Sequence, residues 1–151
     1  MPSYRIHLLG GLVAAGLAAG AAIWLGWAVG AQWRLLLGLA GVCALGALFP
    51  DIDTDSKGQT VFYSAFLAVD LWLIAGRRYE LAAWLGLLAV VPILANHRGW
   101  IHTWWAMLLL PLPIVAVPVF VFGRPWEVFL PFYGAFVLGY FSHLLLDGQF
   151  R

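Results

Sequence analysis

The sequence predicts an all-α membrane protein, a polytopic helix bundle with about six transmembrane helices. Of the 151 residues, 64% are hydrophobic and only 10% are charged, whereas soluble domains carry about 25% charged residues. Most of the chain consists of apolar runs whose length is close to the roughly 20 residues that a helix needs to cross a bilayer. No polar stretch is long enough for a separate soluble head, so we expect residues 1–151 to form a single transmembrane helical domain.

Six apolar segments follow one another, and short polar stretches separate them. They cover residues 8–30, 33–49, 60–76, 80–95, 103–122 and 127–146. Small residues dominate the first segment, which favours close helix packing. Pro111, Pro113 and Pro118 should kink or break the fifth segment, because proline lacks a backbone donor. The 8 Lys and Arg residues are scattered along the chain, so we expect no nucleic-acid partner.

The topology of six segments gathers the metal-binding residue types on one side of the membrane. Odd segments begin, and even segments end, on the face that carries the N-terminus, called face A here; the opposite side is face B. Face A then receives all 4 histidines and four of the 7 acidic residues. Imidazole and carboxylate groups bind divalent metals, and near hydrocarbon they are costly unless paired or coordinated. The candidate metal ligands are His7, Asp51, Asp53, His97, His102, His143 and Asp147.

His143 and Asp147 lie four residues apart at the end of the sixth segment. A helix therefore directs both side chains from the same face, one turn apart. They are either two ligands, a ligand with the carboxylate that orients it, or a hydrogen-bonded pair at a helix end.

The stretch after the second segment, residues 50–55, holds three carboxylates, which repel one another unless a cation is near. We expect this stretch to end the second helix and to continue as extended chain. An EF-hand is excluded, because Ser56 and Phe62 stand where that motif has Gly and Glu. The alternatives are another kind of metal site and a solvated polar turn.

Between the fourth and fifth segments, His97 and His102 enclose Arg98, whose planar guanidinium suits a phosphate or a carboxylate. The alternative is an interfacial loop whose side chains reach toward the lipid headgroups. Asp70 stands apart in the middle of the third segment. It is either functional or paired with a structural partner such as Arg77.

Four short motifs carry a resemblance to a known family. They are His7-x-x-x-Gly11, Phe-Pro-Asp-Ile-Asp at 49–53, His-Arg-Gly-Trp-Ile-His-Thr at 97–103, and Ser-His-Leu-Leu-Leu-Asp at 142–147. In this order they resemble the membrane-bound metal-dependent hydrolases, also described as LexA-binding, inner-membrane-associated hydrolases. Ile101 stands where that family usually has a hydroxyl residue, so no hydroxyl role is expected there. The order of ligands is similar, more remotely, to that of zinc-dependent phospholipases C.

The resemblance implies a multi-pass protein of a bacterial or archaeal inner membrane with metal-dependent hydrolase activity. The matching site positions are His7, Asp51, Asp53, His97, Arg98, His102, His143 and Asp147.

We therefore expect a hydrolase that cleaves a phosphoester or similar bond of a lipid or lipid-linked substrate taken from the bilayer. One or two divalent ions, zinc first and otherwise manganese, iron or magnesium, would activate a water molecule. Asp53 or Asp55 would accept its proton, and Arg98 would neutralise the developing charge. The alternative is a non-catalytic metal transporter or sensor with the same ligands, although transporters normally bind ions at the membrane midplane. The sequence predicts no oligomeric state.

Overall fold

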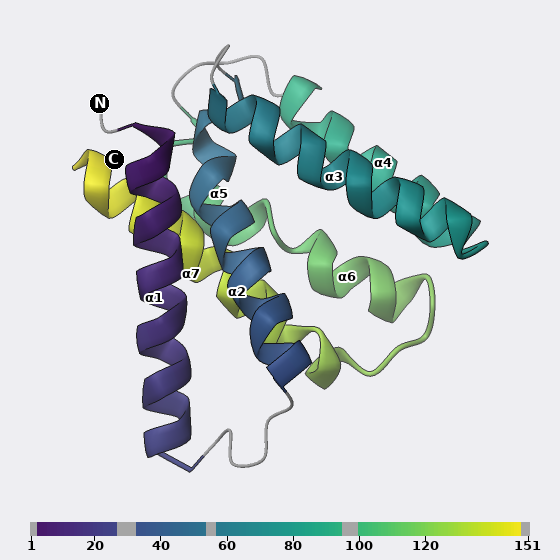
Figure 1. Ribbon diagram of the computed structural model, residues 1–151. Coiled ribbons are helices and arrows are strands. Elements are labelled where there is room, and N and C mark those ends of the chain that lie inside the picture. Colours follow the sequence, from purple (N-terminus) through teal and green to yellow (C-terminus); the bar gives the residue numbers. More distant parts are fainter. Residues whose placement is uncertain (1–2, 27–32, 54–56, 95–99, 149–151) are drawn as a thin grey trace.

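The computed structural model confirms the all-α class (Figure 1). It describes residues 3–26, 33–53, 57–94 and 100–148, and no strand occurs within these ranges. The elements, with η for a short 3-10 helix, are α1 Tyr4–Trp24, α2 Trp33–Leu48, η1 Phe49–Asp53, α3 Lys57–Ala75, α4 Tyr79–Leu94, α5 Trp104–Leu109, α6 Pro113–Phe120, η2 Trp126–Val128 and α7 Leu130–Asp147.

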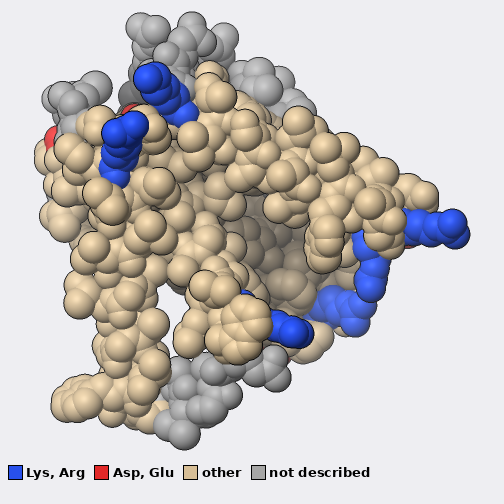
Figure 2. Space-filling model, in the orientation of Figure 1, with Lys and Arg blue, Asp and Glu red and all other residues tan. Residues whose placement is uncertain are grey.

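Four helical segments of the described ranges are long and apolar enough to cross a membrane. They are Tyr4–Trp24, Trp33–Ile52, Lys57–Ala75 and Trp126–Asp147. Helix α4 and the pair α5–α6 occupy the two remaining segments that the sequence predicts. Large apolar side chains point outward along the helices, with Leu17 71% and Trp72 73% exposed. Such surfaces suit contact with lipid. In Figure 2, uncharged residues cover most of the described surface in view, and Lys and Arg side chains stand in a few separate places.

The first helix ends at Trp24, six residues before the predicted end at residue 30. The amide of Leu25 bonds the carbonyl of Ala21, and Gly26 turns the chain with a left-handed φ of +76°. Glycine adopts this conformation without steric cost, so it stops the helix inside a run that is apolar throughout.

The predicted fifth segment is broken into α5 and α6 at residues 110–112. Pro111 and Pro113 cannot donate the backbone hydrogen bonds that would continue α5, as the sequence predicts. The prediction of extended chain after α2 is wrong for residues 50–53, which turn as part of the 3-10 helix η1. The side-chain amide of Gln59 donates to the carbonyl of Ile52 at 2.9 Å and holds this turn against α3.

Helices α2 and α7 pack backbone against backbone through two glycines. A Cβ atom on Gly139 would lie 1.9 Å from the carbonyl oxygen of Cys43, and one on Gly46 would lie 2.2 Å from the carbonyl oxygen of Phe136. Gly11 brings α1 against the same place, where the Cys43 thiol donates to the Gly11 carbonyl at 3.2 Å. Three helices therefore meet closely at the face A end of the molecule.

Toward face B the same helices diverge. Gly16 and Gly20 on α1 have no atom within 4 Å of the position that a Cβ would take. The small residues of α1 instead line an apolar cavity of about 1040 Å³ with residues of α2 and α7. Close packing through small residues, which the sequence predicts for the whole first segment, is thus confined to its beginning.

A cluster of buried side chains, most of them aromatic, packs η1 and the start of α3 against α7. Its buried members are Phe49, Ile52, Phe62, Ile101, Phe136, Tyr140 and Leu144. Because Phe49 and Ile52 lie on both sides of Asp51, this cluster fixes the position of the acidic turn.

Replacing Gly139 with Ala should destabilise the protein by about 3 kcal/mol, because the added methyl meets a backbone carbonyl that cannot move aside cheaply. Thermal unfolding in detergent, followed by circular dichroism, measures the change. Gly134→Ala is the matched control on α7, since its Cβ meets nothing within 4 Å. Equal unfolding temperatures for the two variants would contradict the close contact of α2 with α7.

Candidate metal centre

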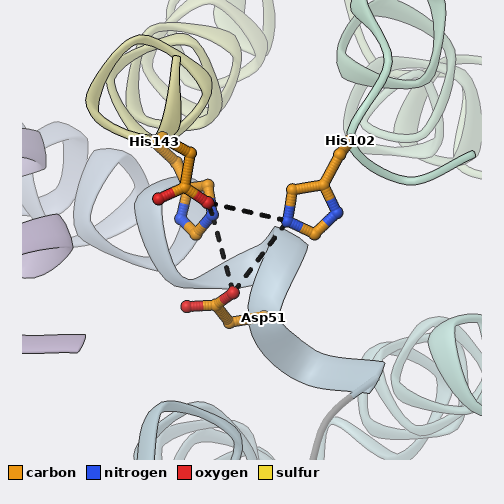
Figure 3. A group of neighbouring side chains, drawn as sticks. Asp51, His102 and His143 are labelled. Atoms are coloured by element: carbon orange, nitrogen blue, oxygen red, sulfur yellow. Dashed lines mark ion pairs between the residues drawn. The ribbon is translucent and has the colours of Figure 1, made fainter. Parts of the chain in front are cut away.

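Four potential metal ligands come together at the face A end of the bundle. Asp51, His102, His143 and Asp147 each offer an atom, and these four atoms all lie within 4.8 Å of one another. Asp51 comes from η1, His102 from the turn before α5, and His143 and Asp147 from the last turns of α7. Figure 3 shows the rings of His102 and His143 directed toward the carboxylate of Asp51.

The distances between these four atoms are close to those between the ligand atoms of one metal ion. His143 Nε2 lies 3.3 Å from Asp147 Oδ2 and 3.6 Å from Asp51 Oδ1, while His102 Nε2 lies 4.0 Å from each of the same two oxygens. Ligands about 2.0–2.1 Å from a tetrahedral ion are separated by about 3.3 Å. Small movements of these side chains would therefore bring the four atoms to the distances of one ion's ligands.

His143 is held in the tautomer that a metal ligand requires. Its Nδ1 lies 2.8 Å from the carbonyl oxygen of Ala47 on α2. A carbonyl can only accept, so Nδ1 carries the proton and Nε2 keeps a free lone pair. This Nε2 atom is buried and has no hydrogen-bond partner within the described residues, and the same is true of His102 Nε2. Both nitrogen atoms are directed toward the carboxylates of Asp51 and Asp147, which is the arrangement expected around a bound metal ion.

Asp147 connects His7 to this group. The Oδ1 atom of Asp147 lies 3.4 Å from His7 Nε2, while its Oδ2 faces His102 and His143. The His7 ring also stacks on that of His143, with centroids 3.9 Å apart and an interplanar angle of 19°. His7 is thus placed beside the four-residue group, where it can orient Asp147 or serve a second ion. Its role as a ligand stays a prediction.

The electrostatics of the cluster favour a cation. Asp147 is the last residue of α7, and Asp51 follows the end of α2, so both carboxylates stand at helix ends that already carry partial negative charge. Two such groups repel each other unless a positive charge lies between them. Within the described residues, the ion pairs of Asp147 are with the imidazoles of His7, His102 and His143.

Two contacts hold His102 in place. The hydroxyl of Tyr140, which is fully buried, donates to the carbonyl of Ile101, the residue before His102. The side chain of Thr103 accepts from the amide of Ala106 at 3.3 Å and caps α5. The capping role of Thr103 is visible in the sequence pattern, whereas the bond from Tyr140 spans 39 residues and needs the fold.

The cluster is open on one side. The side chains of His7, His143 and Asp147 are at most 3% exposed, but those of His102 and Asp51 are 15% and 24% exposed. Beside His102, the rings of Trp100 and Trp105 stack with centroids 5.4 Å apart. Tryptophan is typical of the membrane–water interface. A molecule at the headgroup level would therefore approach the site from the side of Asp51 and His102.

The remaining predicted site residues are not placed by the structure. His97, Arg98 and Asp55 lie outside the described residues, and so does the side chain of Asp53. Asp70 lies in the middle of α3, apart from the four-residue group, and its Oδ1 is buried without a hydrogen-bond partner among the described residues.

Comparison with known proteins identifies the family. The model of the YdjM inner membrane protein family matches residues 1–150, so the chain belongs to that family. No curated protein and no solved structure matches the chain. The family match supports the predicted inner-membrane setting, and the hydrolase activity stays a prediction.

His143→Ala should lower the affinity for Zn²⁺ at least 100-fold, because it removes a ligand that is already oriented by Ala47. Equilibrium dialysis of the full-length protein in detergent, with the metal measured by mass spectrometry, gives the affinity. Asp70→Asn, which removes a carboxylate outside the group, should leave it unchanged. Equal affinities for wild-type protein and His143→Ala would rule out this centre.

Tyr140→Phe should weaken Zn²⁺ binding about 10-fold with little change in ring packing, because only the hydroxyl that positions the His102 turn is lost. The same dialysis measures this loss, and far-ultraviolet circular dichroism checks that the helices remain. An unchanged affinity would show that this hydrogen bond does not control the position of His102.

Proposed function

We propose that this member of the YdjM inner membrane protein family is a metal-dependent hydrolase that cleaves a phosphoester or similar bond in a lipid or lipid-linked substrate. The observation that supports it most is the group of Asp51, His102, His143 and Asp147. The Nε2 atoms of its two histidines have no hydrogen-bond partner among the described residues, and one side of the group is partly exposed. Oxygen and nitrogen ligands of this kind suit zinc, manganese and iron.

The position of the group supports hydrolysis over transport. Its members lie in η1 just after the end of α2, in the turn before α5 and in the last turns of α7. Transporters bind their ions near the midplane, between broken helices, where charge crosses the membrane. A group at the surface can instead meet both water and the headgroup of a lipid.

The residues divide the chemistry between them. A divalent ion at this group would polarise the scissile phosphoryl oxygen and make a water molecule more acidic. His143, fixed by the Ala47 carbonyl, and Asp147, fixed beside His7, form the rigid side of the site. Asp51 and His102 form the accessible side. Asp53 and Asp55, two and four residues after Asp51 in the sequence, stay the predicted proton acceptors. Arg98 stays our candidate for neutralising charge that develops on the phosphoryl group.

A lipid substrate is supported by what surrounds the site. The wall beside His102 carries Trp100 and Trp105, and Trp104 is 58% exposed. Indole rings are stable where apolar chains meet water. A phosphate at the depth of these rings would lie level with the metal group while its acyl chains stay in the bilayer.

Phosphate release from phosphatidic acid in proteoliposomes, and headgroup release from phosphatidylglycerol, test this proposal. We expect turnover that a chelator abolishes and Zn²⁺ or Mn²⁺ restores. Asp51→Asn and His143→Ala should each lower kcat/KM at least 100-fold, because a weakened metal site loses charge stabilisation that the reaction requires.

Glu127→Gln is the matched control, since it removes a carboxylate from η2, on face B. It should keep wild-type turnover. Metal uptake into the vesicles without release of phosphate or headgroup would contradict hydrolysis and would favour the transporter alternative.

A further inference from the structure

A cavity on face B is lined by several charged side chains. It has a volume of about 490 Å³ and lies between the α3–α4 turn and the segment that joins α6 to η2. The residues that line it are Arg77, Arg78, Tyr79, Glu80, Leu81, Pro118, Phe122, Arg124 and Phe129. In Figure 2, blue side chains gather at the far end of the α3–α4 hairpin and below it.

The lining carries a net charge of +2, from three arginines and one glutamate. None of the three guanidinium groups makes an ion pair with any described residue, Glu80 included. Guanidinium groups bind phosphate through two parallel hydrogen bonds. Three such groups around one cavity, with no ion pair to them among the described residues, predict an anionic ligand with phosphate-like oxygens.

The backbone conformation of Arg77 also supports a ligand-binding role for this residue. Arg77 has φ +56°, and it is the only non-glycine residue with positive φ among those described. Its amide bonds the carbonyl of Ile74 at 2.9 Å, and that of Arg78 bonds Leu73 at 2.8 Å, which closes the end of α3. Glycine or asparagine suits this position in a helix C-cap. An arginine here gives up local stability, and its side chain lines the cavity.

The apolar part of the lining selects among anions. Pro118, Phe122 and Phe129 form a wall opposite the charges of the α3–α4 turn. Inorganic phosphate gains nothing from such a wall, whereas a lipid buries the first carbons of its chains against it.

We propose that this cavity binds the phosphodiester headgroup of an anionic membrane lipid, held by Arg77, Arg78 and Arg124. The site is separate from the metal group, which lies at the opposite end of the helices, and the proposal does not rest on the hydrolase activity. The headgroup of such a lipid would bind arginines of the α3–α4 turn and of the α6–η2 segment at the same time, and would so link these two parts of the chain.

Native mass spectrometry of the full-length protein, titrated in detergent with phosphatidylglycerol or with phosphatidylcholine, tests the site. We expect tighter binding of phosphatidylglycerol. Arg124→Gln and Arg77→Asn should each weaken it about fivefold, since each arginine near an anionic surface contributes about that factor. Millimolar inorganic phosphate should leave the bound lipid in place.

Arg34→Gln is the matched control, because Arg34 also lies on face B but does not line the cavity. It should keep wild-type lipid affinity. Asparagine tolerates the left-handed conformation, so Arg77→Asn should unfold at or above the wild-type temperature while its lipid affinity falls. Equal loss for Arg34→Gln, displacement by inorganic phosphate, or loss of binding only together with loss of stability would each overturn the proposal.

Discussion

The close contact between α2 and α7 brings Asp51 together with His143 and Asp147 in the candidate metal centre. Gly46 and Gly139 let the two backbones touch, and the contact leaves no room for a Cβ atom on either. It brings the Ala47 carbonyl within hydrogen-bond distance of His143, and so decides which nitrogen of that ring is free. The same contact sets the end of α2, and therefore η1 and Asp51, beside the last turns of α7.

From this contact follows a concentration of negative charge that needs a cation. Two helix ends and two carboxylates converge, and the described groups that pair with Asp147 are the imidazoles of His7, His102 and His143. An arginine would neutralise the carboxylates permanently through ion pairs. Neutral imidazoles leave the charge to a bound ion, so the composition of the cluster favours metal binding over a structural ion-pair network.

The sequence predicts much of this arrangement because membrane topology restricts it strongly. Segment ends must return to one face or the other, so counting spans places His7, Asp51, His102 and His143 on a common face. The i,i+4 spacing of His143 and Asp147 is likewise a local property of a helix. The break at Pro111 and Pro113 was predictable because proline acts on its own helix.

The rest depends on contacts between residues far apart in the chain. The tautomer of His143 depends on a carbonyl 96 residues away. The position of His102 depends on a hydrogen bond between the preceding residue, Ile101, and a hydroxyl 39 residues further along the chain. No local pattern distinguishes Gly46 and Gly139 from Gly16 and Gly134, at which an added Cβ atom would meet no atom within 4 Å. The early end of α1 and the turn of η1 were missed because a single glycine or side-chain amide decides them within uniform apolar or polar runs.

The most direct test of the metal centre is anomalous X-ray scattering from crystals of the full-length protein purified without chelators. We expect an anomalous peak within about 2.3 Å of His102 Nε2, His143 Nε2 and a carboxylate oxygen of Asp51 and of Asp147. A well-ordered cluster that shows no anomalous peak after soaking with Zn²⁺ or Mn²⁺, or a metal bound elsewhere on the chain, would contradict it.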